Sequence, residues 1–210
     1  GIRADEATRS MAGFLTRRAH GRPHVTLKLA LSLDGAAAMA SGTSKWITGS
    51  EARAHAHLER SRHEAILVGR NTLDADAPAL DVRLAGLEDR SPRRVVLTSG
   101  AAPDGWTAIT APAGIAALEG VDHLLVEGGA KTAAAFLAAD LVDRLLLYRA
   151  PILIGGGRTL PDIGLTDLAD AHGRWRLHDA RVLGSDRLDV YERARKPALS
   201  GKVGTGFPSG

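Results

Sequence analysis

Cysteine is absent from the 210-residue chain, which excludes disulfide bonds, thiolate catalysis and zinc sites built on cysteine. Aromatic residues make up only 4% of the sequence, so the core must consist mainly of Leu, Val, Ile and Ala. No apolar run reaches the roughly 18 residues of a membrane-spanning helix, and no signal-peptide pattern occurs. Together these absences predict a soluble, cytoplasmic protein with no membrane partner.

A strong excess of charge of one sign is also missing. The net charge is +3, and the basic residues are scattered along the chain rather than clustered. Nucleic-acid-binding domains carry a concentrated basic patch or stripe, so we expect no nucleic-acid partner. A mild basic excess suits a phosphorylated small molecule as the binding partner.

Several catalytic motifs are absent as well. The eight histidines include no His-Glu-x-x-His pair, and no metal site is predicted. The chain has no Gly-x-Ser-x-Gly elbow of a hydrolase and no Gly-x-x-x-x-Gly-Lys-Ser/Thr phosphate loop. A Rossmann Gly-x-Gly-x-x-Gly is missing too, because Gly155-Gly156-Gly157 lacks the spacing.

The sequence does contain an alternation of strand and helix patterns. Strands are predicted at 24–33, 64–69, 94–98, 123–126 and 143–150, helices at 48–62, 113–118 and 132–139, and a C-terminal hairpin at 175–183 and 187–192. This order predicts an α/β fold with a mostly parallel central sheet, flanking helices and an antiparallel hairpin at the edge. We expect one domain over 23–193 and a disordered tail over 194–210.

Two features of these elements carry chemistry. Lys28 is the single charge in the apolar run 24–33, and burying it is costly unless it has a partner or a function. Glu127-Gly128-Gly129 follows a strand and precedes a helix, a turn that aims backbone N–H groups and the positive helix end at an anion. A lysine at a strand edge and a tight turn without a ligand are the structural alternatives.

A series of motifs resembles a known family. They are VTLKLALSLDG at 25–35, ASGTSKWIT at 40–48, AILVG at 65–69, LVEGG at 125–129 and the glycine-rich segment after Pro151. Over about 22–193 the chain resembles the reductase domain of riboflavin biosynthesis. The resemblance implies a dihydrofolate-reductase-like fold, a homodimer, and NADPH-dependent reduction of the ribosyl group of 5-amino-6-(5-phosphoribosylamino)uracil. In this family the domain often follows a deaminase domain, and residues 1–22 resemble the junction and are expected to be its remnant.

The resemblance also implies site residues. Substrate contacts are expected at Ser44, Arg60, Leu80, Arg83 and Glu127, and cofactor contacts at Ala30, Trp46, Thr72, Asp76, Ser99, Gly129, Ala130, Lys131 and Thr132. A guanidinium matches phosphate oxygens in two-point contacts, which suits Arg60 and Arg83 to the 5′-phosphate. Lys28 is the expected catalytic proton donor or electrostatic stabiliser, and Asp76 is expected to orient either Lys28 or the nicotinamide ribose.

Two alternatives stay open at this point. One is an NADPH reductase of the same fold that acts on a different, pterin-like or folate-like substrate. The other is a nucleotide-binding remnant without catalysis, which would bind NADPH and never oxidise it. Departures from the family pattern, three alanines after Asp34-Gly35 and Asp76-Ala77-Pro78 in place of Asp-Asp-Pro, bear on the substrate.

Overall fold

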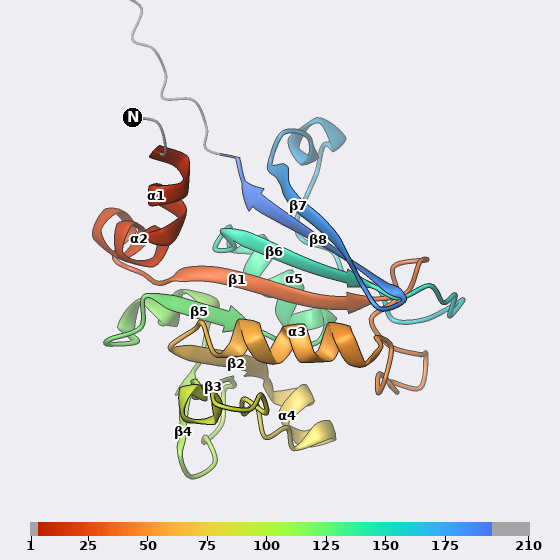
Figure 1. The fold of residues 1–210 in the computed structure, drawn as a ribbon, viewed down its shortest axis with the longest axis horizontal. Helices are drawn as coiled ribbons and strands as arrows, with labels where there is room; N and C mark the ends of the chain where they lie inside the picture. The colour runs from red at the N-terminus through yellow and green to blue at the C-terminus, as the bar shows by residue number, and fades with distance from the viewer. Residues whose placement is uncertain (1–3, 195–210) are drawn as a thin grey trace, which may run out of the picture.

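A single sheet organises the part of the chain that the computed structural model describes, residues 4–194 (Figure 1). Its eight strands are β1 (His24–Leu31), β2 (Ala65–Gly69), β3 (Arg93–Leu97), β4 (Trp106–Ile109), β5 (His123–Val126), β6 (Arg144–Arg149), β7 (Trp175–Leu183) and β8 (Asp186–Arg193). The order across the sheet is β4-β3-β2-β5-β1-β6-β8-β7. The six strands from β4 to β6 in this order run parallel, whereas β8 and β7 are antiparallel.

Helices connect the strands and cover the sheet. They are α1 (Ala4–Ser10), α2 (Ala12–His20), α3 (Ser50–Arg60), α4 (Arg70–Asp76) and α5 (Ala130–Ala138), with short 3-10 helices η1 (Glu88–Arg90), η2 (Pro112–Ala117) and η3 (Leu168–Ala171). Figure 1 shows α3 and α5 on opposite faces of the sheet. In α3 an acidic residue, Glu51, occupies the first turn, and His57 and Arg60 occupy the last turn. This arrangement complements the helix dipole and places two cationic or polar side chains where α3 ends.

Alternate residues of the central strand face opposite layers, as the pleat requires. Val25 and Leu27 of β1 are fully buried in the main core together with Phe136 of α5. The other face carries a separate cluster, in which Ala52 of α3 packs with Tyr148 of β6. Because β1 is covered on both faces, its predicted continuous apolar character is explained.

The predicted fold class is confirmed: a mostly parallel sheet flanked by helices, closed by a C-terminal antiparallel hairpin. The short strand β4 was not predicted; it pairs only with β3 at the sheet edge and has two exposed residues among four. The predicted helix at 113–118 is the 3-10 helix η2. The predicted disordered tail lies, from 195 on, outside the described residues. Within residues 4–194 no helix is long and apolar enough to cross a membrane.

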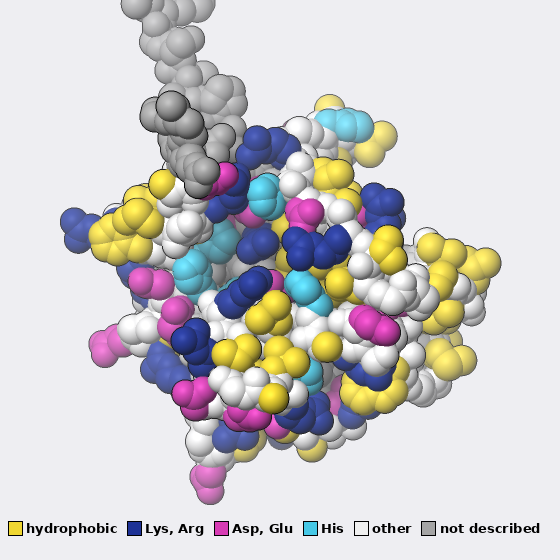
Figure 2. All heavy atoms as spheres, in the orientation of Figure 1, with side chains coloured by type: hydrophobic (Ala, Val, Ile, Leu, Met, Phe, Trp, Pro, Cys, Tyr) yellow, Lys and Arg dark blue, Asp and Glu magenta, His cyan; other side chains and the backbone are white. Residues whose placement is uncertain are grey.

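A cavity of about 150 Å³ lies near the amino ends of the strands. Figure 2 shows the face that carries α3, on which basic and histidine side chains are numerous. The cavity is lined mainly by such groups, with two carboxylates: Arg9, His24, Glu59, Arg62, His63, His123, Arg144 and Glu192. Burial is the main cause that lowers the pKa of His24 to about 4, so this histidine is neutral near pH 7. The cavity lies at the amino ends of β1 and β5, whereas Glu127 and the start of α5 lie at the carboxyl end of β5.

Candidate active site

Lys28 lies in the middle of β1, on the face that α3 covers. Its side chain is 20% exposed, and its Nζ atom lies 3.8 Å from Oε2 of Glu127 and 5.7 Å from the ring centroid of Tyr148. Glu127 is the residue directly after β5, and Tyr148 belongs to β6, so the two strands that flank β1 supply both neighbours. The half-buried lysine therefore has the partner that its cost of burial requires.

Glu127 is held from a second side by Arg60, the last residue of α3. Arg60 donates from Nε to Oε1 at 2.7 Å and from Nη2 to Oε2 at 2.9 Å, a two-point contact. Burial alone would raise the pKa of Glu127, but the charge of Lys28 and the hydrogen bonds from Arg60 outweigh it and hold the pKa below its usual value. One carboxylate thus sits between two cations, and the cluster has a net positive charge.

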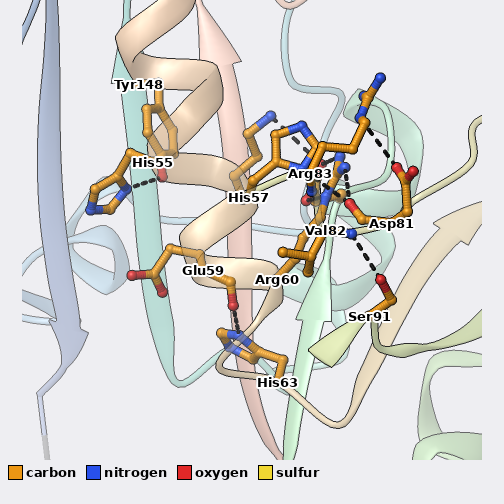
Figure 3. Close-up of polar contacts among 12 residues, drawn as sticks. His55, His57, Glu59, Arg60, His63, Asp81, Val82, Arg83, Ser91 and Tyr148 are labelled. Carbon is orange, nitrogen blue, oxygen red and sulfur yellow. Dashed lines mark hydrogen bonds and ion pairs between the residues drawn. The ribbon is translucent and has the colours of Figure 1, made fainter. Parts of the chain in front are cut away.

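The same helix end holds the segment from Leu80 to Arg83 (Figure 3). Arg60 donates from Nη1 to the carbonyl oxygen of Asp81 at 3.0 Å, and His57 contacts the same oxygen through Nδ1, also at 3.0 Å. Leu80 is buried in the core beside β2, which fixes the start of the segment. The side chain of Arg83 is 64% exposed, with Nε 3.3 Å from Oδ1 of Asp81. Its guanidinium is therefore open to a ligand from solvent.

Next to this cluster, α5 begins directly after Gly129 without a side-chain cap and without an acidic residue in its first turn. Thr72 of α4 accepts a hydrogen bond at its Oγ1 atom from the backbone N–H of Gly129 at 3.2 Å. A Cβ atom on Gly128 would lie 2.4 Å from Cβ of Thr132, and one on Gly69 would lie 2.1 Å from its Oγ1 atom. Glycine at both strand ends therefore lets the start of α5 seat closely, with backbone N–H groups available for a pyrophosphate.

Asp76, at the end of α4, contacts a different lysine from the one predicted. Its Oδ1 atom lies 3.1 Å from Nζ of Lys45, whereas Lys28 pairs with Glu127. Each of the two acids thus pairs with a different lysine, and the described residues show no direct contact between Asp76 and Lys28. The other expected role of Asp76, orientation of the nicotinamide ribose, stays a prediction. Trp46 is 67% exposed, with the guanidinium of Arg53 4.8 Å from its ring centroid.

Comparison with known proteins identifies the family to which this chain belongs. The family model of the RibD C-terminal domain matches residues 23–111 and 114–188. The chain belongs to the RibD C-terminal domain family. Riboflavin biosynthesis protein RibD of Mycobacterium tuberculosis is 36% identical over 204 residues, which cover 90% of this chain and 60% of that protein.

Solved RibD structures agree with this assignment. Acinetobacter baumannii RibD superposes with a TM-score of 0.80 at 29% identity, covering 91% of this chain and 64% of that chain. A diaminohydroxyphosphoribosylaminopyrimidine deaminase/5-amino-6-(5-phosphoribosylamino)uracil reductase from Thermotoga maritima gives 0.79 at 26% identity, covering 90% and 62%. This RibD C-terminal domain thus spans less than two thirds of the length of each of the three proteins. The predicted family and its dihydrofolate-reductase-like fold are confirmed.

The structure brings part of the predicted site into direct contact. In this RibD C-terminal domain, Lys28, Glu127 and Arg60 form one charged cluster, and Thr72 contacts the turn at Gly129. The other predicted residues occupy positions around them without a shared contact: Ala30 and Ser44 are half-buried, Ser99 is exposed after β3, and Lys131 is exposed in the first turn of α5. The predicted roles of these residues stay predictions.

Two residues beside the charged cluster, His57 and Tyr148, were not predicted from the sequence. His57 lies one turn before Arg60 on α3, so the two share a helix face, and this spacing is the signal that could have found it. Tyr148 offers no comparable signal, since its place under Lys28 follows from the pairing of β1 with β6. Its hydroxyl lies 2.8 Å from Nδ1 of His55, which ties β6 to α3.

Proposed function

We propose that this chain is a 5-amino-6-(5-phosphoribosylamino)uracil reductase, which uses NADPH to convert the ribosyl group of its substrate to the ribityl product. The observation that carries the proposal is the charged cluster of Lys28, Glu127 and Arg60 beside the uncapped start of α5. Family membership supports it, and the printed name of the Thermotoga maritima relative includes this reductase activity. The cytoplasmic location and the homodimer stay predictions from the sequence.

The start of α5 fits a dinucleotide. The backbone N–H groups of Ala130, Lys131 and Thr132 would bind the pyrophosphate, because the first turn has no acidic residue to compete; the N–H of Gly129, the fourth expected contact, donates to Thr72 in this structure. Trp46, Thr72 and Asp76 would border the cofactor, and Ser99 would lie near the 2′-phosphate that distinguishes NADPH from NADH. When bound, the reduced nicotinamide supplies the hydride for the reaction.

The residues of the cluster divide the remaining tasks. Opening the ribosyl ring requires a proton at the sugar oxygen or nitrogen, and we assign its delivery, or the stabilisation of the charge there, to Lys28. Glu127 keeps this ammonium in place and fixes Arg60. Arg83, whose guanidinium is exposed, would bind the 5′-phosphate together with Ser44. Glu127 and Arg60 already bind each other in a two-point contact. They would bind the substrate only through the hydrogen-bonding capacity that this contact leaves unused.

The test follows NADPH oxidation with the phosphoribosylaminouracil substrate and, in parallel, with dihydrofolate. We expect oxidation only with the former. Lys28→Met should lower turnover by about 100-fold or more, as for other general acid–base groups. Arg83→Ala should raise KM for the phosphorylated substrate, whereas Arg90→Ala, an exposed arginine of η1, should leave it unchanged. Oxidation with dihydrofolate alone, or none with either compound, contradicts the proposal.

A further inference from the structure

His57 has two polar neighbours at a single nitrogen atom. Its Nδ1 atom lies 3.0 Å from the carbonyl oxygen of Asp81 and 3.2 Å from the backbone nitrogen of Arg83 (Figure 3). The first neighbour is an acceptor and the second is a donor. A ring nitrogen carries either a proton or a lone pair, so only one of the two contacts is a hydrogen bond in a given state of the ring.

The other partners of these two groups decide which contact it is. The carbonyl oxygen of Asp81 already accepts from Nη1 of Arg60 at 3.0 Å. For the N–H of Arg83, the acceptor that the described residues provide is Nδ1 of His57. The carbonyl oxygen of Asp81 and the N–H of Arg83 both have a hydrogen-bond partner when the proton of the neutral ring is on Nε2 and the lone pair of Nδ1 accepts from Arg83.

We propose that His57 is a positioning residue that anchors the backbone of Arg83 to α3, and so sets where the Arg83 guanidinium meets the substrate phosphate. The inference rests on the proposed function, in which Arg83 binds that phosphate. The same helix end carries Arg60, which is fixed to Glu127 and through it to Lys28. One turn of α3 therefore sets the spacing between the phosphate end and the reacting end of the substrate.

Protonation should exchange this bond for another, because Nδ1–H would then donate to the carbonyl oxygen of Asp81 and the N–H of Arg83 would lose its acceptor. The charged groups that face His57 are Arg60 on its own helix, Asp81 and Arg83 on the segment beside it, and Glu127 at the end of β5. Burial, followed by the charge of Arg60, lowers the pKa of His57. The ring is thus neutral and able to accept at neutral pH, and it loses the lone pair only when the pH falls through that lowered pKa.

Two amide substitutions separate the role of Nδ1 from mere occupancy of space. In Asn the polar atoms are two bonds from Cβ, as Nδ1 is in histidine, whereas in Gln they are three bonds away, as Nε2 is. We expect His57→Asn to keep KM for the phosphoribosyl substrate near the wild-type value. His57→Gln should raise KM about threefold to tenfold with little change in kcat, the size of one lost hydrogen bond. When the pH is lowered, KM should rise less in His57→Asn than in the wild type. Both proteins bind the same substrate phosphate, but only the wild type has an imidazole at position 57.

A second readout is independent of catalysis. Hydrogen exchange of the Arg83 amide should be about threefold to tenfold faster in His57→Gln than in the wild type, and close to the wild-type rate in His57→Asn. Binding of ribose 5-phosphate, measured by calorimetry, should weaken in the same order. If the wild type oxidises no NADPH with its substrate, the proposed function fails while these two measurements still decide the role of His57. Equal exchange and equal binding in all three proteins overturn the anchor.

Discussion

The substitution Glu127→Gln tests the charged cluster directly. The variant keeps the shape of the side chain and removes its charge, in a position where the side chain is 7% exposed. Both carboxylate oxygens accept from Arg60, so the new amide NH₂ group faces a donor of Arg60 whichever way it turns. Lys28, 3.8 Å away, loses its counter-ion at the same time.

The loss can be estimated from these contacts. The Lys28–Glu127 attraction at that distance is about 4 kcal/mol at an effective dielectric constant of roughly 20, and one charge-assisted hydrogen bond adds about 1.5–3 kcal/mol. The desolvation that the pair already carries reduces this sum, and removal of one member of a buried pair typically costs about 3–5 kcal/mol. For a domain of this size the melting temperature should fall by about 6–20 °C.

Thermal unfolding followed by circular dichroism at pH 7 measures this fall. Glu119→Gln, an exposed position, is the matched control and should melt like the wild type. The double variant Lys28→Met/Glu127→Gln should be more stable than Glu127→Gln alone, because one of the two unpaired cations is gone. The folded-state pKa of Glu127 is depressed, so its stabilisation is full above about pH 4.5 and disappears as the pH falls through the folded pKa. A fall in melting temperature of only about 2 °C or less at pH 7 would refute the reasoning, because the expected fall is at least about 6 °C.

Three further substitutions, one of them a control, test the glycine turn and the loop after β1. Gly128→Ala should lower the melting temperature and weaken NADPH binding, measured by fluorescence titration, because the new Cβ would lie 2.4 Å from Thr132, whereas Gly129→Ala, with 3.4 Å to its nearest neighbour, should melt like the wild type. Equal melting of both variants contradicts the packing argument. Asp34→Asn should speed hydrogen exchange at the amide of Gly155, because the backbone N–H of Gly155 donates a hydrogen bond to the Asp34 carboxylate at 2.8 Å in the wild type. The hydrogen bond from Ser32, followed by those from the backbone of Gly155, lowers the pKa of Asp34 to about 2, so the protection should persist until the pH falls to that range; loss of protection near pH 4 would contradict it.

Much of the fold could be predicted because its signals are local. The apolar run of β1, the Gly-Gly turn before α5 and the turn between β7 and β8 each combine a period with a breaker residue. The strand β4 has the breaker, a Gly/Pro turn before it, but not the period, because it has only four residues and pairs on one side only. Its position comes from the edge that β3 offers and not from its own pattern.

The site was predictable as a set of residues but not as a set of contacts. The family motifs pointed to Lys28, Arg60 and Glu127 one at a time. Arg60 and Glu127 are 67 residues apart, and their two-point contact depends on where α3 ends relative to β5. Asp76 and Glu127 both come after Lys28 and Lys45 in the chain. The local sequence contains nothing that pairs Asp76 with Lys45 and Glu127 with Lys28.

The place of β1 in the sheet has a consequence for synthesis of the protein. Among the described strands this one comes first, and it lies between β5 and β6, which follow it by roughly 90 residues or more. At a translation rate of roughly 5–20 residues per second, β1 waits about 5–20 s for its first partner. Throughout this interval an apolar strand with two unpaired edges is open to other chains. The yield of native protein should therefore depend on how well this strand is kept from pairing with other chains, a risk that the final stability of the domain does not remove.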